Sequence, residues 1–271
     1  MISLWPNIAA HAAGGEIVDE PASTLELVYR LYAGGIPLGQ IDFLARLRGD
    51  SYTAASTLET VGVANALWAA KLEATSYGAL RELDLLPTNY DAFSIHAATN
   101  GIRQQVTLAY TDGLPTVTPN PAYREPIILD NHEMQDTLDP VSALVLAVTR
   151  YKAHSEKPCA VSVPVFDGRR RYTVTLDFVR NRDIAMDNGL YSGEVQICSL
   201  AYKAIAGASQ HVFEGEDVPE IFVWVTTIQS ATDPERQYVL PLRLWTETDF
   251  GIIVALLTTV RLDGADQTGL N

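Results

Sequence analysis

The segment 132–136, His-Glu-Met-Gln-Asp, is the stretch of this 271-residue chain that comes closest to a catalytic motif. It differs from the HExxH motif of zinc proteases only in its last residue, Asp136. That motif needs two histidines one turn apart on a helix, where they bind one zinc ion from the same side. Here the second histidine is missing, and the segment precedes the helix that the sequence predicts at 139–151. We therefore expect no metal site.

Other patterns associated with catalysis also lack their context. Asp249-Phe250-Gly251 spells a metal-binding motif of protein kinases, but the chain has neither a glycine-rich phosphate loop nor an HRD motif, and a hairpin turn explains it. The spacings GxGxxG and GxSxG do not occur. The 33 acidic residues are too many for one pair to be chosen as acid and base. We predict a protein that is not an enzyme and has no cofactor; the alternative is an envelope hydrolase with an unrecognised carboxylate site.

The charge pattern indicates one candidate binding surface. A net charge of −14 argues against general nucleic-acid binding, which depends on clustered Lys and Arg. Residues 150–182 reverse this balance, with eight basic residues against three acidic ones. Within them, Arg169, Arg170 and Arg171 could bind an anionic headgroup or an acidic partner, because guanidinium groups match phosphate and carboxylate. Alternatively, they pair with nearby acids or keep an edge strand soluble.

The N-terminus and the cysteines indicate the compartment. Residues 1–22 hold a short apolar stretch followed by Ala10-His11-Ala12, which is similar to a signal-peptidase site, although the usual basic start is missing. This segment is either part of an export signal or a flexible leader, and we favour the signal. In an oxidising compartment Cys159 and Cys198 would form a disulfide, although two buried thiols are the alternative. No apolar run approaches the length of a spanning helix, so at most a peripheral contact with the membrane is expected.

The apolar pattern of the chain predicts mainly β-structure. Alternation and turn residues indicate about eleven strands and no linker. A short helix is predicted at 63–72 with Trp68 as its anchor, and a long surface connection at 111–135, which is rich in proline. We expect one domain over residues 23–265 and a flexible tail at 266–271. The predicted strands cover residues 25–31, 36–47, 52–60, 74–80, 90–95, 102–110, 159–166, 172–179, 193–200, 221–229, 238–248 and 252–262.

The segment 139–151 is predicted to be the central helix. Asp139 suits the N-cap and Pro140 the first helical position, where its missing N–H costs nothing. The helix is apolar on almost every side, so we expect it to be buried nearly all round. Its side chains Leu144, Val148 and Tyr151 would then join Trp68 in an apolar interior.

Many strands and one apolar helix leave few arrangements. A single antiparallel sheet of this length must curl, and the helix can fill the space inside it. We predict an incomplete barrel, or β-spiral, around one buried helix; two smaller sheets that share the helix are the alternative.

Four short segments of the chain form a recognisable series. They are Tyr29-x-x-Tyr32-x-Gly34-Gly35-Ile36-x-x-Gly39, Ser76-x-Gly78 with Leu86-Pro87-x-x-Tyr90, Asp136-x-x-Asp139-Pro140-x-Ser142-Ala143, and Phe166-Asp167-Gly168-Arg169-Arg170-x-Tyr172. In this order they resemble a family of exported Gram-negative proteins catalogued as a domain of unknown function, and the resemblance extends over residues 25–262. It implies a periplasmic β-spiral wrapped round a helix, similar to envelope integrity protein B and more remotely to the outer-membrane lipoprotein carriers.

The resemblance also implies a function in the cell envelope. Its relatives suggest that the protein maintains the envelope by binding lipoproteins, lipids or envelope proteins, and they bring no catalytic motif with them. Together with the leader and the cysteines, this predicts a non-enzymatic periplasmic protein that binds or scaffolds an envelope component.

Overall fold

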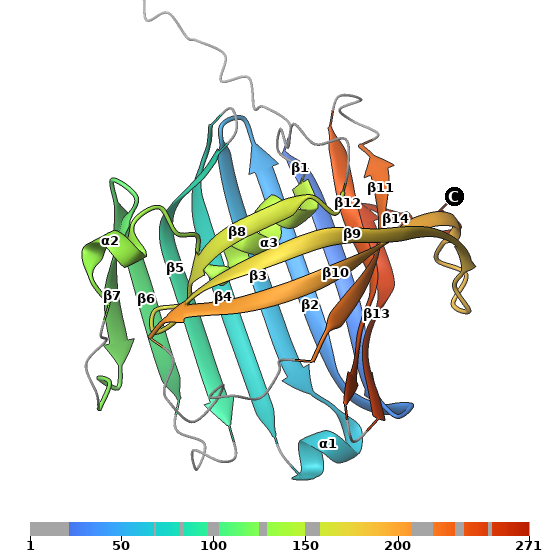
Figure 1. The fold of residues 1–271 in the computed structure, drawn as a ribbon, viewed down its shortest axis with the longest axis horizontal. Helices are drawn as coiled ribbons and strands as arrows, with labels where there is room; N and C mark the ends of the chain where they lie inside the picture. Colours follow the sequence, from blue (N-terminus) through green and yellow to red (C-terminus); the bar gives the residue numbers. More distant parts are fainter. Residues whose placement is uncertain are drawn as a thin grey trace, which may run out of the picture.

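The protein is built on one large antiparallel sheet (Figure 1). The computed structural model describes residues 22–67, 69–81, 84–96, 103–124, 129–149, 158–207, 219–230, 236–248 and 251–270. Within them, fourteen strands pair into a single open sheet, which confirms the mainly β prediction. The strands are β1 (Ser23–Ala33), β2 (Ile36–Arg48), β3 (Ser51–Thr60), β4 (Ala70–Arg81), β5 (Asp84–His96), β6 (Gln104–Thr111), β7 (Leu114–Asn120), β8 (Val161–Phe166), β9 (Arg171–Ala185), β10 (Ser192–Ala206), β11 (Ile221–Gln229), β12 (Gln237–Thr248), β13 (Gly251–Leu262) and β14 (Ala265–Gln267).

The order of the strands divides the sheet into two meanders. It runs β7-β6-β5-β4-β3-β2-β1-β13-β12-β11-β10-β9-β8, so each strand neighbours the next in sequence everywhere except at β1 and β13. There the two meanders join, with Leu25 opposite Leu262 and Ala33 opposite Ile253. The sheet therefore ends at β7 on one side and β8 on the other.

The sheet curls until its two ends approach each other. In Figure 1, β8, β9 and β10 cross in front of β2–β5. The turn between β8 and β9 reaches β6, since a Cβ atom on Gly168 would lie 2.6 Å from the side chain of Val106. Tyr123 Oη donates a hydrogen bond to the Gly168 carbonyl at 3.2 Å. These contacts hold the open sheet in its barrel-like shape.

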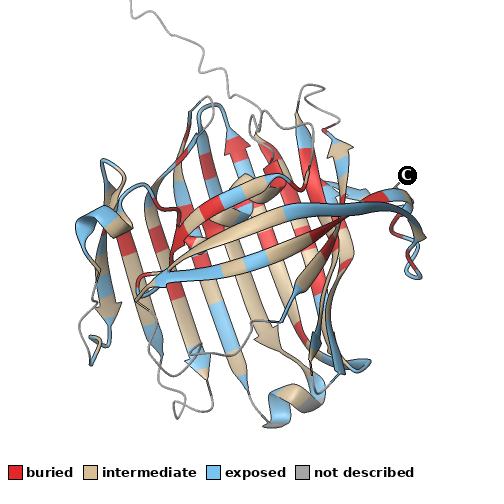
Figure 2. Ribbon diagram, in the orientation of Figure 1, coloured by how far each residue is buried: buried red, intermediate tan, exposed pale blue. Residues whose placement is uncertain are grey.

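The helix α3 (Pro140–Thr149) lies inside this curl, against β3, β4 and β5 on one side and β8 and β12 on another. Figure 2 shows that buried residues of the rear strands gather behind it and β8. Val141, Val145 and Val148 are buried on one face of the helix. Leu144 is 45% exposed, because it lies at the border of that face. The helix is thus buried on one side and not all round, since an apolar side chain can also remain at the surface.

Two shorter helices accompany α3, and only one of them is predicted. In the described ranges, α1 (Gly62–Leu67) lies between β3 and β4 and overlaps the short helix predicted at 63–72, whereas α2 (Asn131–Met134) lies in the segment predicted to be a surface connection. Trp68 and Tyr151, two of the predicted interior residues, lie outside the described residues. So do residues 1–21 of the predicted leader.

The proline-rich segment 111–135 is more regular than the sequence predicts. It contains β7, which among the described strands pairs with β6 alone. Pro115 and Pro119 are accommodated in this strand because β7 is an edge strand of the described sheet. A proline has no N–H to donate to a neighbouring strand, and an edge does not require one. The one turn of α2 contains His132, and its N-cap is Asp130.

The segment 266–270 is also ordered, where the sequence predicts a flexible tail. It includes part of β14, which pairs with β13. Leu270 accepts a hydrogen bond from the Ser192 N–H and donates one to the Leu190 carbonyl, both at 2.9 Å. The C-terminal residues therefore cover the turn between β9 and β10.

Candidate functional site

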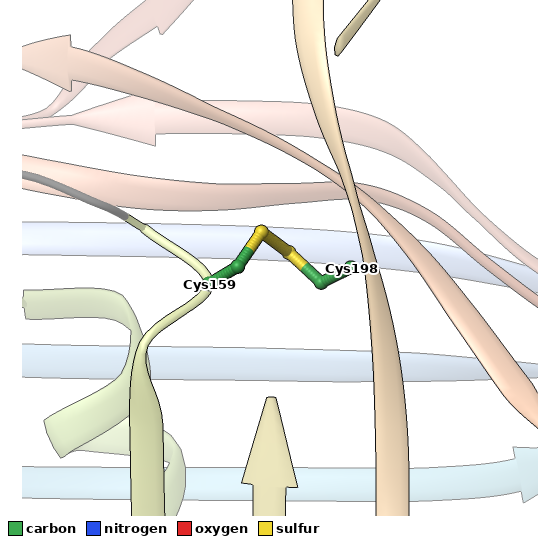
Figure 3. The surroundings of a disulfide bond; sticks show 2 residues. All are labelled: Cys159 and Cys198. Atoms are coloured by element: carbon green, nitrogen blue, oxygen red, sulfur yellow. A yellow bond between two sulfur atoms is a disulfide. The ribbon is translucent and has the colours of Figure 1, made fainter. Parts of the chain in front are cut away.

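The predicted disulfide is present between Cys159, just before β8, and Cys198 on β10 (Figure 3). The two Cα atoms are 5.5 Å apart, a usual separation for such a bond. Both cysteines are almost fully buried and pack with Val223, Val225 and Val239. Because β9 separates β8 from β10, the bond ties two strands that share no ladder.

A buried polar cluster fixes the start of α3. Asp139 is the N-cap, and its carboxylate accepts hydrogen bonds from the backbone N–H groups of Val141 at 2.9 Å and Ser142 at 2.8 Å. The hydroxyl of Ser142 also donates to it, as does that of Ser76 on β4 at 2.8 Å. Tyr52 Oη on β3 lies 2.6 Å from Ser142 Oγ. The cluster thus connects the helix to β4 through Asp139 and to β3 through Ser142.

Burial governs the electrostatics of this cluster. Burial raises the pKa of Asp139 above its usual value, and this effect is larger than the opposite effect of the hydrogen bonds from Ser142, Ser76 and Val141. Burial and the charge of Asp139 together raise the pKa of Tyr52 to about 12. Asp139, Ser142 and Ser76 are 2% exposed or less, so the cluster has a structural role and is closed to a substrate. The sequence predicts the cap but not the strand residues that meet it.

The three arginines of the basic hairpin have separate partners within the chain. Arg170 forms an ion pair with Asp167 at 3.0 Å. Arg169 lies over the ring of Tyr123, and Arg171 donates to the Glu133 carbonyl at 3.2 Å. These contacts favour the intramolecular interpretation of this segment over a shared anion-binding surface.

A groove of about 590 Å³ is the strongest candidate for a ligand site. It lies over β11, β12 and β13, between the turn that joins β1 to β2 and the end of β9. Most of its lining is apolar or aromatic, and its ionisable side chains include one cation and one carboxylate. The lining consists of Tyr32, Gly34, Gly35, Ala185, Met186, Asp187, Trp224, Arg243, Ile252, Val254 and Leu256. We call it the Arg243 groove.

The floor of the Arg243 groove is set by strand register. Trp224 pairs with Arg243, and Arg243 pairs with Leu256, so the three form a row across β11, β12 and β13. Successive side chains of a strand point to opposite faces. Their neighbours Val223 and Leu257 therefore face the core, where both are buried. The groove is on the other face of the sheet.

Aromatic rings surround the guanidinium of Arg243. Its Cζ atom lies 4.9 Å from the ring centroid of Trp224 and 5.4 Å from that of Trp245. Phe222 stacks on Trp245, with 5.4 Å between ring centroids. Such stacking holds a cation in a fixed position. Burial lowers the pKa of Arg243, the nearby cation of Arg182 lowers it further, and Asp187 raises it.

The groove lies outside the sites that the sequence predicts. Its residues come from five separate segments of the chain, and only the pairing of β11 with β12 places Trp224 beside Arg243. The sequence signal that could have indicated the groove is the alternation of aromatic residues in these two strands. At the rim, Gly34 and Gly35 have φ values of 54° and 84°, as a tight type I′ turn requires, and they place no side chain over the opening.

The described residues contain neither a metal cluster nor a helix that could span a membrane. No group of three or more His, Cys, Asp or Glu could hold a metal ion in the part of the chain that the structure describes. In the same residues, no helix is both long and apolar enough to cross a membrane.

Comparison with known families identifies this chain at residues 28–258, which match the family described as "Protein of unknown function (DUF3108)". The chain belongs to this family. A comparison with curated proteins gives no match.

Solved structures resemble the DUF3108 fold. A crystal structure of a "Beta-barrel-like Protein of Domain of Unknown Function DUF1849 from Brucella abortus" aligns with a TM-score of 0.54 and 11% identity, over 90% of this chain and 98% of that chain. A DUF1329 family protein from Desulfovibrio piger ATCC 29098 aligns with a TM-score of 0.27 and 12% identity, over 90% and 86% of the two chains, which is too low to support an argument. The first likeness supports the barrel-like fold alone.

Proposed function

We propose that this DUF3108 protein is a non-enzymatic periplasmic protein of the cell envelope that holds an amphipathic envelope component, such as a lipid or the acyl group of a lipoprotein. The observation that carries this proposal is the Arg243 groove. Its volume of about 590 Å³ lies in the usual range for small-molecule sites, about 300–1,000 Å³. Its mostly apolar lining suits an acyl chain.

The disulfide supports the proposed compartment. A buried bond between Cys159 and Cys198 is typical of proteins that fold in an oxidising environment. The resemblance to exported envelope proteins supports the same location. We infer that the protein acts in the periplasm of a Gram-negative cell, where lipids and lipoproteins are exposed to such a carrier or scaffold.

A binding role is preferred to hydrolysis because of the chemistry of the groove. Hydrolysis would need a nucleophile or an acid and base that substrate can reach. None of the described residues that line the groove is Ser, Cys or His, and Asp187 is the one acidic side chain among them, so the lining offers no pair of carboxylates as acid and base. The carboxylate of Asp139 is enclosed and already accepts four hydrogen bonds.

The test is photocrosslinking of the full chain with a diazirine-bearing fatty acid, followed by mass spectrometry. We expect labels on groove residues such as Met186 and Leu256. Ile252→Glu should lower labelling at least about tenfold, because it replaces apolar contact worth about 1.5 kcal/mol or more with a charge. Leu72→Glu is the matched control: Leu72 is 41% exposed and Ile252 is 45% exposed, but only Ile252 lines the groove. Labelling outside the groove, or equal labelling of both variants, would overturn the proposal.

A further inference from the structure

Within the part of the chain that the structure describes, the guanidinium of Arg243 lacks a hydrogen-bond acceptor. It is half-buried on the floor of the groove, and no described residue forms a hydrogen bond or an ion pair with it. Its Nε atom is buried without a hydrogen-bond partner, and so is Nε1 of the adjacent Trp224. Removing a cation from water without giving it a partner is costly. These unpaired donors indicate that a ligand supplies the missing acceptor.

The surroundings of Arg243 favour an anion over other ligands. Arg182, exposed on β9, is close enough to affect Arg243 electrostatically and adds positive charge. Asp187 is the one carboxylate in the lining, but it is exposed and forms no ion pair with Arg243. The guanidinium stacks on the rings of Trp224 and Trp245, which hold it in place. This stacking leaves its outer N–H groups able to donate hydrogen bonds to a ligand. These groups can donate hydrogen bonds to a carboxylate or phosphate at little cost in side-chain ordering.

The groove beside the cation is apolar along one strand. Ile252, Val254 and Leu256 alternate on the groove face of β13, and Leu256 lies directly opposite Arg243. From Ile252 to Leu256 the strand extends about 13 Å, at roughly 3.3 Å a residue. An acyl chain could lie along this row with its charged end at Arg243.

We propose that Arg243 is the anion subsite of the groove and that the ligand is an acidic amphiphile, with a carboxylate or phosphate on the guanidinium and its chain along β13. This inference rests on the proposed function and specifies its ligand class. A free fatty acid and an acidic lipid headgroup would supply the same chemistry.

Calorimetric titration of the full chain with four single-chain probes tests the proposal. Dodecanoate and dodecyl phosphate represent the two anionic sources, dodecanol is the neutral control, and dodecyltrimethylammonium is the cationic control. At least one of the two anions should bind at least about tenfold more tightly than dodecanol. A tenfold difference in affinity corresponds to the usual energy of a hydrogen bond to a charged group.

Three variants locate the effect. Arg243→Gln should weaken binding of the anion about tenfold to a hundredfold and leave the affinity for dodecanol within about twofold, which also shows that the groove is intact. Asp187→Asn should strengthen anion binding a few-fold, because it removes a like charge. Arg46→Gln changes an exposed arginine of β2 that does not line the groove, and it should have no effect.

The possible outcomes separate the subsite from the function. If dodecanol binds as tightly as the anions and Arg243→Gln changes nothing, the anion subsite is wrong while the acyl groove stands. Tighter binding of the cationic probe would also overturn the subsite. If none of the four probes binds the unchanged protein, the groove is not an acyl site, and the proposed function fails together with the subsite.

Discussion

Replacing Asp139 by Ala should destabilise the protein by about 3 kcal/mol. The substitution removes an N-cap, which contributes about 1 kcal/mol. It also takes a charged acceptor from the buried hydroxyls of Ser76 and Ser142, at a cost of about 1–3 kcal/mol. Asp130→Ala is the matched control, because Asp130 caps the one turn of α2 at the surface. That variant should lose about 1 kcal/mol or less.

The pH dependence of the same site has a definite sign. Burial raises the pKa of Asp139 from its ordinary value of 3.8, so the folded protein binds the proton more tightly than the unfolded chain. Its favourable contribution is then fully present below pH 3.8 and is lost as the pH rises through the pKa of the folded protein. Asp139→Asn keeps an N-cap acceptor and cannot ionise. Relative to this variant, the wild type should become less stable as the pH rises from about 4 towards neutrality.

Urea unfolding followed by circular dichroism measures both effects. The free energy of unfolding would be compared for the wild type, Asp139→Ala, Asp139→Asn and Asp130→Ala between pH 4 and pH 8. Taking the difference between the wild type and Asp139→Asn cancels the other carboxylates. A loss below about 1 kcal/mol in Asp139→Ala, or a wild type that gains stability relative to Asp139→Asn as the pH rises, would refute the role assigned to the cluster.

Two further predictions concern the scaffold. Reduction, or the double replacement of Cys159 and Cys198 by Ala, should cost about 4 kcal/mol, because the bond spans 39 residues. Calorimetry should then show a melting temperature lower by roughly 10 °C, and equal melting with and without reductant would contradict a stabilising bond. Gly78→Ala should lower the urea midpoint by the equivalent of about 1–3 kcal/mol, since its Cβ would lie 2.2 Å from the Leu86 carbonyl oxygen on β5. An unchanged midpoint would show that the two strands can separate freely.

The sequence predicts those parts of the fold that depend on local pattern. Alternation places most strands within a few residues, Asp139 identifies the start of α3, and Asp167-Gly168 marks the turn between β8 and β9. β7 escapes prediction, because its prolines are tolerated only at an edge that the sequence does not reveal. Leu144 is misplaced because an apolar helix need not be covered on every side.

The candidate site depends on contacts that no local pattern specifies. The Arg243 groove needs the register between β11 and β12 and a turn from the opposite end of the chain, which holds Gly34 and Gly35. The basic hairpin had the stronger sequence signal, yet Arg169 to Arg171 take partners within the chain. Charge clustering in a sequence therefore identified a less promising surface than a single arginine held between two tryptophans.

The pairing of β1 with β13 has a consequence for the synthesis of the chain. All the other neighbours along the main order of strands are consecutive in sequence, so each meander can form as its own residues emerge. β1 is different, since its partner is made more than 200 residues later. Until β13 arrives, β1 is an open edge with the apolar side chains Leu25, Leu27 and Tyr29 on one face. An unpaired edge of this kind readily joins other chains, so a chaperone that shields β1 would protect the unfinished protein.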